Sequence, residues 1–260
     1  MSAAVLGAEL LTAAVAYLWA ARRVRRWRAA RTAAFLGGLV ALAVALVGLD
    51  AAADRALVAH MAQHLVLVYA AAPLLVLGSP IALGLRAAGA PARRLLRARL
   101  LAHPLVGWCA LPAAMAATHF TGLYDLAVRH PLVHIGEHAL YLAAAALFWR
   151  PVLGADPVPH RPGVAGRVLY LMLAAGPLAL VGVAMEASTH PWYEAYAGRP
   201  GALADQHDAG AVMWVGGGLA LAVALMAVAW SGLLREHRRQ LAYEEATRTR
   251  RARAFEEAAT

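Results

Sequence analysis

Lysine is absent from this sequence of 260 residues, and charged residues of either sign are scarce. All 24 basic residues are arginine, and charged residues make up 15% of the chain against 62% for hydrophobic residues. An average soluble domain carries about 25% charged residues. The scarcity of charge therefore excludes an ordinary soluble domain. It predicts an all-α membrane protein whose length suits one helical bundle.

Cysteine is almost absent as well. Cys109 is the single cysteine, which excludes an intramolecular disulfide and any CxxC motif for copper or redox chemistry. A free cysteine between Trp108 and Ala110 in an apolar segment is usually a small core residue, so we expect it to be buried. The sequence also has no phosphate loop, no nucleophile elbow and no HExxH motif. We therefore expect no enzymatic activity.

Long apolar runs organise the chain. A transmembrane helix needs about 20 mostly apolar residues, and no internal repeat relates the runs to one another. We predict seven transmembrane helices, over roughly 3–21, 33–49, 57–79, 104–122, 133–149, 168–187 and 209–234.

The arginines indicate how the spans are oriented. They gather in alternate loops, and the positive-inside rule places such loops in the cytoplasm. The N-terminus is then outside and the C-terminus cytoplasmic. The net charge of +9 therefore reflects membrane topology, and we expect no nucleic-acid partner. The basic loops carry Arg22, Arg23, Arg25, Arg26, Arg28 and Arg31, then Arg86, Arg93, Arg94, Arg97 and Arg99, then Arg150, Arg161 and Arg167, and finally Arg235, Arg238 and Arg239, whereas the opposite loops hold Arg55, Arg129 and Arg199.

The two ends of the chain carry separate expectations. No basic segment precedes the first apolar run and no clear cleavage site follows it, so we expect a retained helix there and no signal peptide. Residues 1–234 form the predicted transmembrane domain, and 235–260 form a charged cytoplasmic tail. Alternating charges in the tail are typical of a solvated helix, which we expect to lie along the membrane.

Most of the histidines fall at one side of this predicted bundle. Eight of the eleven lie at the outer ends of the spans, and His103, His160 and His237 lie on the cytoplasmic side. Two pairs have i,i+4 spacing, which puts both imidazoles of a pair on one helix face with Cβ atoms about 5–6 Å apart. Ionisable groups inside a bilayer are costly, so four imidazoles within two spans predict a metal or cofactor site. These four are His60, His64, His134 and His138.

Methionines and polar residues surround the same sites. Imidazole with thioether is a ligand set that suits copper, Cu(I) above all. Carboxylates and amides orient imidazole ligands, but Glu137 is rotated by about 100° from His138 and is expected to face another neighbour. Single histidines at helix ends are often interfacial residues, and scattered methionines often serve packing alone. The further candidates, as ligands or orienting groups, are Met61, Gln63, Met115, His119, His130, Glu137, Met185, His207, Asp208 and Met213.

Two other functions remain open at this point. A b-type heme is held axially by one histidine from each of two facing helices. A single heme would use one histidine of each pair and leave two unexplained, so a metal site is favoured. A metal-ion transporter would carry polar residues through the cytoplasmic half of the bundle, where this sequence is almost purely apolar.

Several motifs are similar to those of a known family. The run from His60 through Gln63 and His64 to Pro80 resembles the signature of CtaG-type assembly factors for cytochrome c oxidase of the caa type. The stretches 130–141 and 205–214 resemble that family too. The resemblance covers roughly residues 30–235. Ala72 departs from it, because a second proline is expected beside Pro73, and this affects the helix kink more than the site.

The resemblance implies a multi-pass protein of the bacterial plasma membrane that helps to mature a respiratory oxidase, with copper handled on the outer face. It implies His60, His64, His134 and His138 as the functional positions. The implied partners are the lipid bilayer, cytochrome c oxidase subunits and a copper-delivery protein. The single-span copper chaperone that shares the family's name has a cysteine pair, which this chain lacks.

Overall fold

The computed structural model describes residues 3–88, 103–154 and 161–258, and within them every regular element is a helix. Five residues that the sequence places on the cytoplasmic side lie outside the described residues. They are Arg93, Arg94, Arg97, Arg99 and His160. The elements are α1 (Ala3–Arg23), α2 (Ala29–Ala43), the π-helix η1 (Val44–Gly48), α3 (Asp50–Ala53), α4 (Leu57–Val66), the π-helix η2 (Leu67–Ala71), α5 (Ala72–Leu77), α6 (Pro80–Ala88), α7 (Pro104–His119), α8 (Leu123–Arg129), α9 (Pro131–Leu153), α10 (Val164–Ala187), α11 (Glu194–Ala197), α12 (Ala202–Ala211), the π-helix η4 (Val212–Gly216) and α13 (Gly217–Ala258).

Six helices among the described residues are long and apolar enough to cross a membrane, which confirms a multi-pass helical bundle. The fourth predicted span corresponds to α7, whose 16 residues rise about 24 Å at 1.5 Å per residue, less than the bilayer core of about 30 Å. The count of seven stays a prediction. The six helices are Ala3–Arg23, Ala29–Gly48, Leu57–Ala88, Pro131–Leu153, Val164–Ala187 and Ala202–Arg250.

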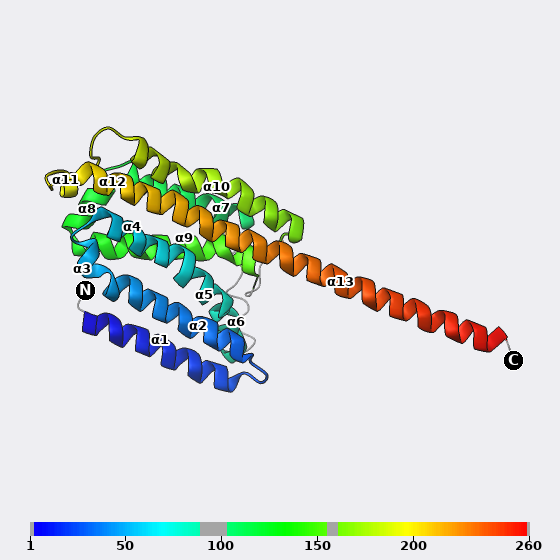
Figure 1. Ribbon diagram of the computed structural model, residues 1–260. Helices are drawn as coiled ribbons and strands as arrows, with labels where there is room; N and C mark the ends of the chain where they lie inside the picture. The colour runs from blue at the N-terminus through cyan, green and yellow to red at the C-terminus, as the bar shows by residue number, and fades with distance from the viewer. Residues whose placement is uncertain (1–2, 89–102, 155–160, 259–260) are drawn as a thin grey trace.

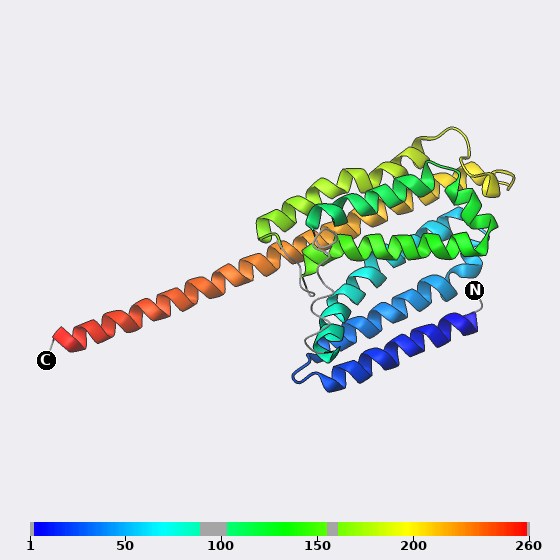
Figure 2. The ribbon, with the colours of Figure 1, turned by 180° about the vertical axis from the view of Figure 1, so that it is seen from behind.

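The long helices run side by side, and the connections between them gather at two opposite ends (Figures 1 and 2). The short helices α3, α8 and α11 lie at one end together with the N-terminus (Figure 1). The last turns of α1, with Arg22 and Arg23, and of α9, with Arg150, lie at the other. Because Arg22, Arg23 and Arg150 lie at the end opposite the short helices, their positions agree with the predicted alternation of loops. Which end faces the cytoplasm stays a prediction from the arginines.

Small residues allow the helices of the core to approach closely. A Cβ added at Gly107 of α7 would lie 2.3 Å from the Leu147 carbonyl oxygen of α9. Gly182 of α10 and Gly210 of α12 face each other in the same way, since a Cβ on Gly182 would lie 2.7 Å from the Gly210 carbonyl oxygen. Small residues are typical of helix interfaces in membranes, where packing and not apolar burial drives association. These contacts fix α7 against α9 and α10 against α12.

The third span is irregular, as its prolines and glycine predict. Pro73 has no N–H, and η2 lies directly before it. In a π-helix the Val68 carbonyl would bond to the N–H five residues on, which is Pro73. The Trp149 indole N–H of α9 donates to that carbonyl instead, at 2.8 Å. The span then turns at Ser79, whose φ of 53° is left-handed, and continues as α6.

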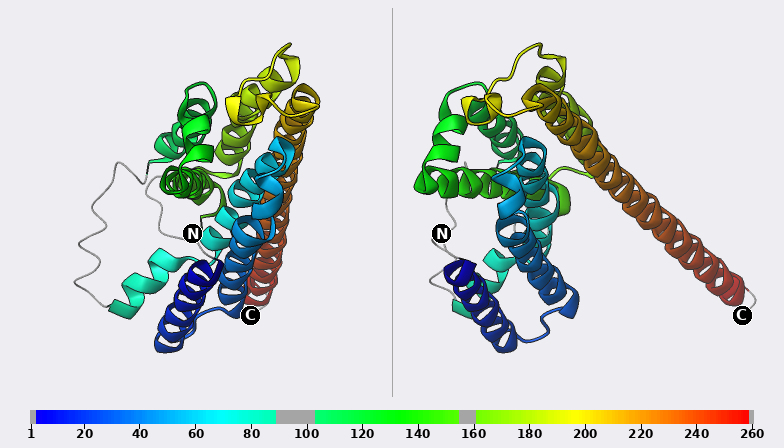
Figure 3. Two further views of the ribbon diagram at one scale, coloured as in Figure 1. Left: turned by 90° about the vertical axis from the view of Figure 1, so that its left-hand side faces the viewer. Right: turned by 60° about the vertical axis from the view of Figure 1, so that its left-hand side comes forward.

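Cys109 is exposed, so the expectation that it is buried is wrong. Its helix α7 packs through Gly107 and Leu111, and Cys109 points away from the bundle. Residues beyond 234 are helical and continue α13, whose first part packs in the core and whose last part projects from the bundle (Figures 1 and 3). How this tail lies relative to the membrane stays a prediction.

Candidate metal centre

Helices α4 and α9 bring the four paired histidines together at the end of the bundle that holds α3, α8 and α11. The His60 and His64 rings on α4 are buried, and those of His134 and His138 on α9 are half-buried. The His60 ring centroid lies 5.1 Å from that of His134, and the His64 centroid lies 5.4 Å from that of His138. Each i,i+4 pair therefore faces the other, as a shared site requires.

The spacing of the two imidazoles on α4 matches that of two ligands on one ion. Their Nε2 atoms are 3.2 Å apart. Two nitrogens bound at about 2.0–2.1 Å to a tetrahedral ion are separated by about 3.3–3.4 Å. The helix thus holds His60 and His64 at nearly the separation of two imidazoles on one metal.

Glu137 joins the cluster through the histidines of α4 and not through His134 and His138 of its own helix. Ligand atoms of His60, His64 and Glu137 lie within 4.8 Å of one another, and so do those of His60, His134 and His138. His60 belongs to both triads. The order His134, Glu137, His138 is the H-x-x-E-H spacing found around zinc in one class of peptidases, a signal that the sequence interpretation overlooked.

The cluster contains several buried polar atoms that have no hydrogen-bond partner among the described residues. They are both carboxylate oxygens of Glu137, Nδ1 of His64, and Nε2 of His134 and of His138. A buried polar group without a partner costs about 1–3 kcal/mol, and an unpaired carboxylate costs more. A cation bound between these atoms would remove that cost. The residues present therefore fit a metal ion, with imidazole nitrogens and one carboxylate as ligands.

The hydroxyl of Tyr196 on α11 sets the proton on His60. It donates to the Ala53 carbonyl at 3.0 Å, and it lies 3.4 Å from Nδ1 of His60. Since its one hydrogen is directed to Ala53, the hydroxyl accepts from His60 Nδ1–H. The neutral ring then carries its lone pair on Nε2, the atom that faces His64. A hydrogen bond that fixes the tautomer of a ligand in this way is typical of metal sites.

Aromatic side chains that the sequence interpretation missed surround the histidines. The Tyr124 ring of α8 lies 5.2 Å from the His60 ring and 5.6 Å from that of His119. His119 Nδ1 bonds to the Tyr193 hydroxyl at 2.7 Å, and that hydroxyl contacts Met185 Sδ at 3.8 Å. Burial raises the pKa of the Tyr193 hydroxyl, so it remains protonated. Tyr193 lies in the loop after α10 and is buried, because this loop folds back over the cluster.

Asp205 of α12 holds the start of the helix that carries His60 and His64. Its carboxylate accepts from the Leu57 N–H at 2.7 Å and from the Val58 N–H at 3.0 Å. These are free donors of the first turn of α4, so a carboxylate also complements the helix dipole. The guanidinium of Arg199 donates to the carbonyls of Asp54 and Arg55 just before that turn. The short outer helices thus position α4.

The remaining candidates divide between the core and the surface. Gln63 is buried and donates to the Ala45 carbonyl at 2.9 Å, so it braces α4 against η1. His130 and Asp208 are exposed, and His207 bonds to the Ser188 carbonyl at 2.8 Å, so the structure does not bring these three into the cluster. The methionines Met61, Met115, Met185 and Met213 are buried in the core that surrounds the site.

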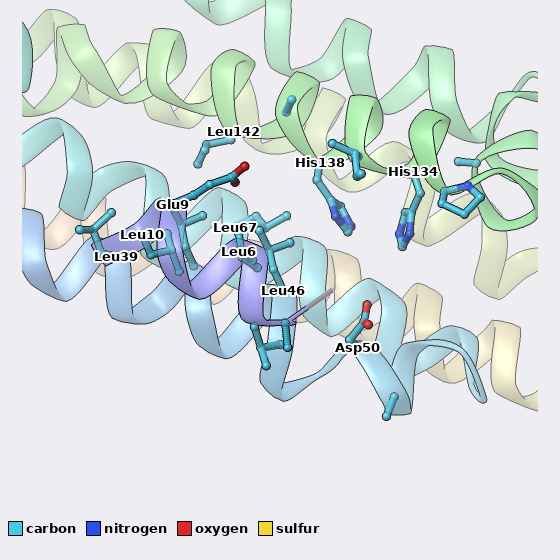
Figure 4. A pocket seen from close by; sticks show the side chains of 18 of the residues that line it. Leu6, Glu9, Leu10, Leu39, Leu46, Asp50, Leu67, His134, His138 and Leu142 are labelled. Carbon is cyan, nitrogen blue, oxygen red and sulfur yellow. The ribbon is translucent and has the colours of Figure 1, made fainter. Parts of the chain in front are cut away.

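A cavity of about 660 Å³ opens between α1, the end of α2, α3 and α9. His134 and His138 point into it from α9, and Asp50 lies on the opposite wall (Figure 4). Asp54 and Glu9 also line the cavity, and most of its other lining residues are apolar. The histidine cluster therefore has one side that is buried in the core and one side that reaches this cavity.

Fold and site define a class of protein, a multi-pass membrane bundle with a potential metal centre near one end. The family model of the cytochrome c oxidase caa3 assembly factor (Caa3_CtaG) matches residues 15–233. The chain belongs to that family, and the resemblance of its motifs is confirmed.

Similar proteins occur in mycobacteria. An uncharacterized protein of Mycobacterium leprae is 27% identical over 265 residues, which cover 90% of this chain and 39% of that protein. Uncharacterized proteins of Mycobacterium bovis and Mycobacterium tuberculosis are each 30% identical over 220 residues, which cover 74% of this chain and 32% of theirs. The chain thus spans about a third of the length of these relatives. No solved structure matches it.

Proposed function

We propose that this protein is a membrane assembly factor for a caa3-type cytochrome c oxidase, and that it binds copper at the histidine cluster and passes it to an oxidase subunit. The family supports the assembly role. The observation that supports a metal is the meeting of four imidazoles and Glu137 in one cluster, in which both Glu137 oxygens and several imidazole nitrogens are buried without a hydrogen-bond partner among the described residues. Copper is the proposed cargo because imidazole is a ligand that suits copper.

Release is as important as binding for a protein that delivers an ion. Transfer would proceed by ligand exchange, in which a donor group of the receiving subunit replaces one imidazole at a time. No covalent bond of a substrate changes in this scheme, so the proposed role is not enzymatic. The outer face of a bacterial plasma membrane is the proposed location, with a copper-delivery protein as the source of the ion.

A heme is less well accommodated by this geometry. The imidazoles of α4 and α9 already contact one another, with the His60 and His134 centroids 5.1 Å apart and the His64 and His138 rings edge to face. A macrocycle between two axial histidines would need that space. The two metal-ligand groups among the described residues also share His60 and lie at one end of the bundle, which favours delivery at one face over transport across the membrane.

The test is oxidase maturation in cells that carry His60→Ala with His64→Ala. A matched control removes two histidines that lie outside the cluster, His130 and His207, by the same substitution. The proposal expects the first variant to insert into the membrane at the wild-type level while oxidase activity and oxidase copper are lost, and it expects a normal oxidase in the control. A normal oxidase in the first variant contradicts the proposal.

A second double variant guards against loss through misfolding. His134→Ala with His138→Ala changes half-buried residues, which the fold tolerates better than buried ones. It is expected to give the same oxidase defect at a normal protein level. If both double variants reach the membrane and both support a normal oxidase, the cluster has no part in maturation.

A further inference from the structure

The two triads differ in their surroundings. The triad of His60, His64 and Glu137 is buried on all three residues. In the other triad His60 is buried, but His134 and His138 are half-buried and line the cavity beside α1. We name the first the inner triad and the second the outer triad. An ion that arrives through the cavity meets the outer triad first.

The two triads share one ligand. His60 is a member of both, and its Nε2 lone pair faces His64. The one lone pair of His60 binds one ion at a time. The triads are therefore better described as two alternative positions for a single ion than as two sites that are filled together. The His60 and His138 ring centroids are 6.3 Å apart, so a move from one position to the other is short.

The cavity has the size and charge of a route for a cation. Its volume of about 660 Å³ is far larger than the space that one water molecule or one hydrated ion needs. The carboxylates of Asp50, the first residue of α3, and of Asp54, which follows α3, are exposed and line it, and Glu9 lines it from α1. Negative charge along a passage raises the local concentration of cations and their rate of arrival.

We propose that a copper ion reaches the cluster through the cavity between α1, α2, α3 and α9, binds first at the outer triad, and moves to the inner triad with His60 as the ligand common to both positions. This inference rests on the proposed copper-binding function. It adds the direction of loading and the order of the ligands. The inner position holds the ion away from water. The outer position is the one from which the ion exchanges with the cavity.

The route is tested by narrowing it without touching a ligand. Ala139 of α9 is exposed and lines the cavity, and Leu140 beside it is exposed and lies outside the lining. Full-length protein in lipid nanodiscs carries Ala139→Trp or, as the matched control, Leu140→Trp. Copper(I) is supplied on a coloured chelator, and stopped-flow absorbance follows its transfer to the protein. The copper per protein at equilibrium is measured in the same samples.

The proposal expects Ala139→Trp to slow uptake by about tenfold or more, equivalent to a barrier higher by about 1.4 kcal/mol, with the same copper content at equilibrium. Leu140→Trp takes up copper at the wild-type rate. Equal rates in the two variants overturn the proposed route while leaving copper binding intact. A wild-type protein that takes up no copper instead contradicts the proposed function itself.

The order of the two positions is tested by removing the inner triad alone. In His64→Ala with Glu137→Gln, copper(I) should still enter, but an excess of chelator should then remove it at least about tenfold faster than from wild type. Uptake that is lost altogether in this variant contradicts the outer triad as the first position. Removal at the wild-type rate contradicts the inner triad as the protected one.

Discussion

The close contact between α7 and α9 gives a direct test of what holds the bundle together. In Gly107→Ala the new Cβ would lie 2.3 Å from the Leu147 carbonyl oxygen and 2.6 Å from its carbon, whereas ordinary contact begins at 3.4 Å. Both neighbours are backbone atoms of a helix, so they cannot turn aside. The two helices must separate by about 1 Å, and overpacking of this kind costs about 1–3 kcal/mol.

The matched control is Gly136→Ala in α9. Nothing lies within 4 Å of a Cβ at Gly136, and the residue is exposed. Alanine is favoured over glycine in a helix by about 0.8–1.0 kcal/mol, so this change should leave stability equal or slightly higher. The same propensity offsets part of the clash at Gly107. We therefore expect Gly107→Ala to lower the free energy of unfolding by up to about 2 kcal/mol, and to be less stable than Gly136→Ala by about 1–3 kcal/mol.

The assay is reversible unfolding in mixed micelles, followed by tryptophan fluorescence of each variant beside wild type. Gly107 lies twelve residues before His119, about 18 Å along α7, so the folded Gly107→Ala protein should still bind copper like wild type. Equal stability of Gly107→Ala and Gly136→Ala would refute the packing argument.

Two further predictions concern hydrogen bonds that position the site. Asp205→Ala removes the acceptor for two N–H groups of α4 and should lower the free energy of unfolding by about 1–2 kcal/mol in the same micelle assay. Asp208 is exposed, and Asp208→Ala should change the free energy of unfolding by less than about 0.5 kcal/mol. Equal effects of the two substitutions would contradict the capping role of Asp205. Trp149→Phe leaves the Val68 carbonyl without its indole donor and should lower the free energy of unfolding by about 1–3 kcal/mol. Trp230→Phe, on the exposed face of α13, should leave the free energy of unfolding nearly unchanged.

Helical periodicity predicted much of the site, because it depends on spacing within one helix. The i,i+4 pairs do place His60 with His64 and His134 with His138 on common faces. The arginine pattern also placed these pairs at the same end of the bundle, where the structure brings them together. Both inferences need no knowledge of how the helices pack.

The failures share one physical cause, which is packing between elements. Glu137 is about 100° from His138 on the helix, and the sequence alone does not show that it lies beside His60 and His64 of α4. Cys109 was expected in the core, but its helix packs through Gly107, and Cys109 is exposed. Tyr124 and Tyr196 come from short outer helices whose place over the cluster depends on contacts distant in the sequence.

The π-helices limit how far periodicity can be used along this chain. A π-helix contains an additional residue in a turn, which shifts the phase of all residues that follow by about 100°. One such segment follows His64, and another holds Met213. Periodicity counted across them assigns residues to the wrong face. Pro73 is the one sequence signal that marks such a position.

The measurement that tests the central claim most directly is the copper content and optical spectrum of the purified full-length protein, wild type beside His60→Ala. His60 is shared by both triads, so its loss should remove more copper than His134→Ala, which leaves the inner triad complete. The account predicts copper bound to the wild type near one ion per protein, little in His60→Ala, and no heme absorption. A wild-type protein with no copper, or one with a Soret band, would contradict it.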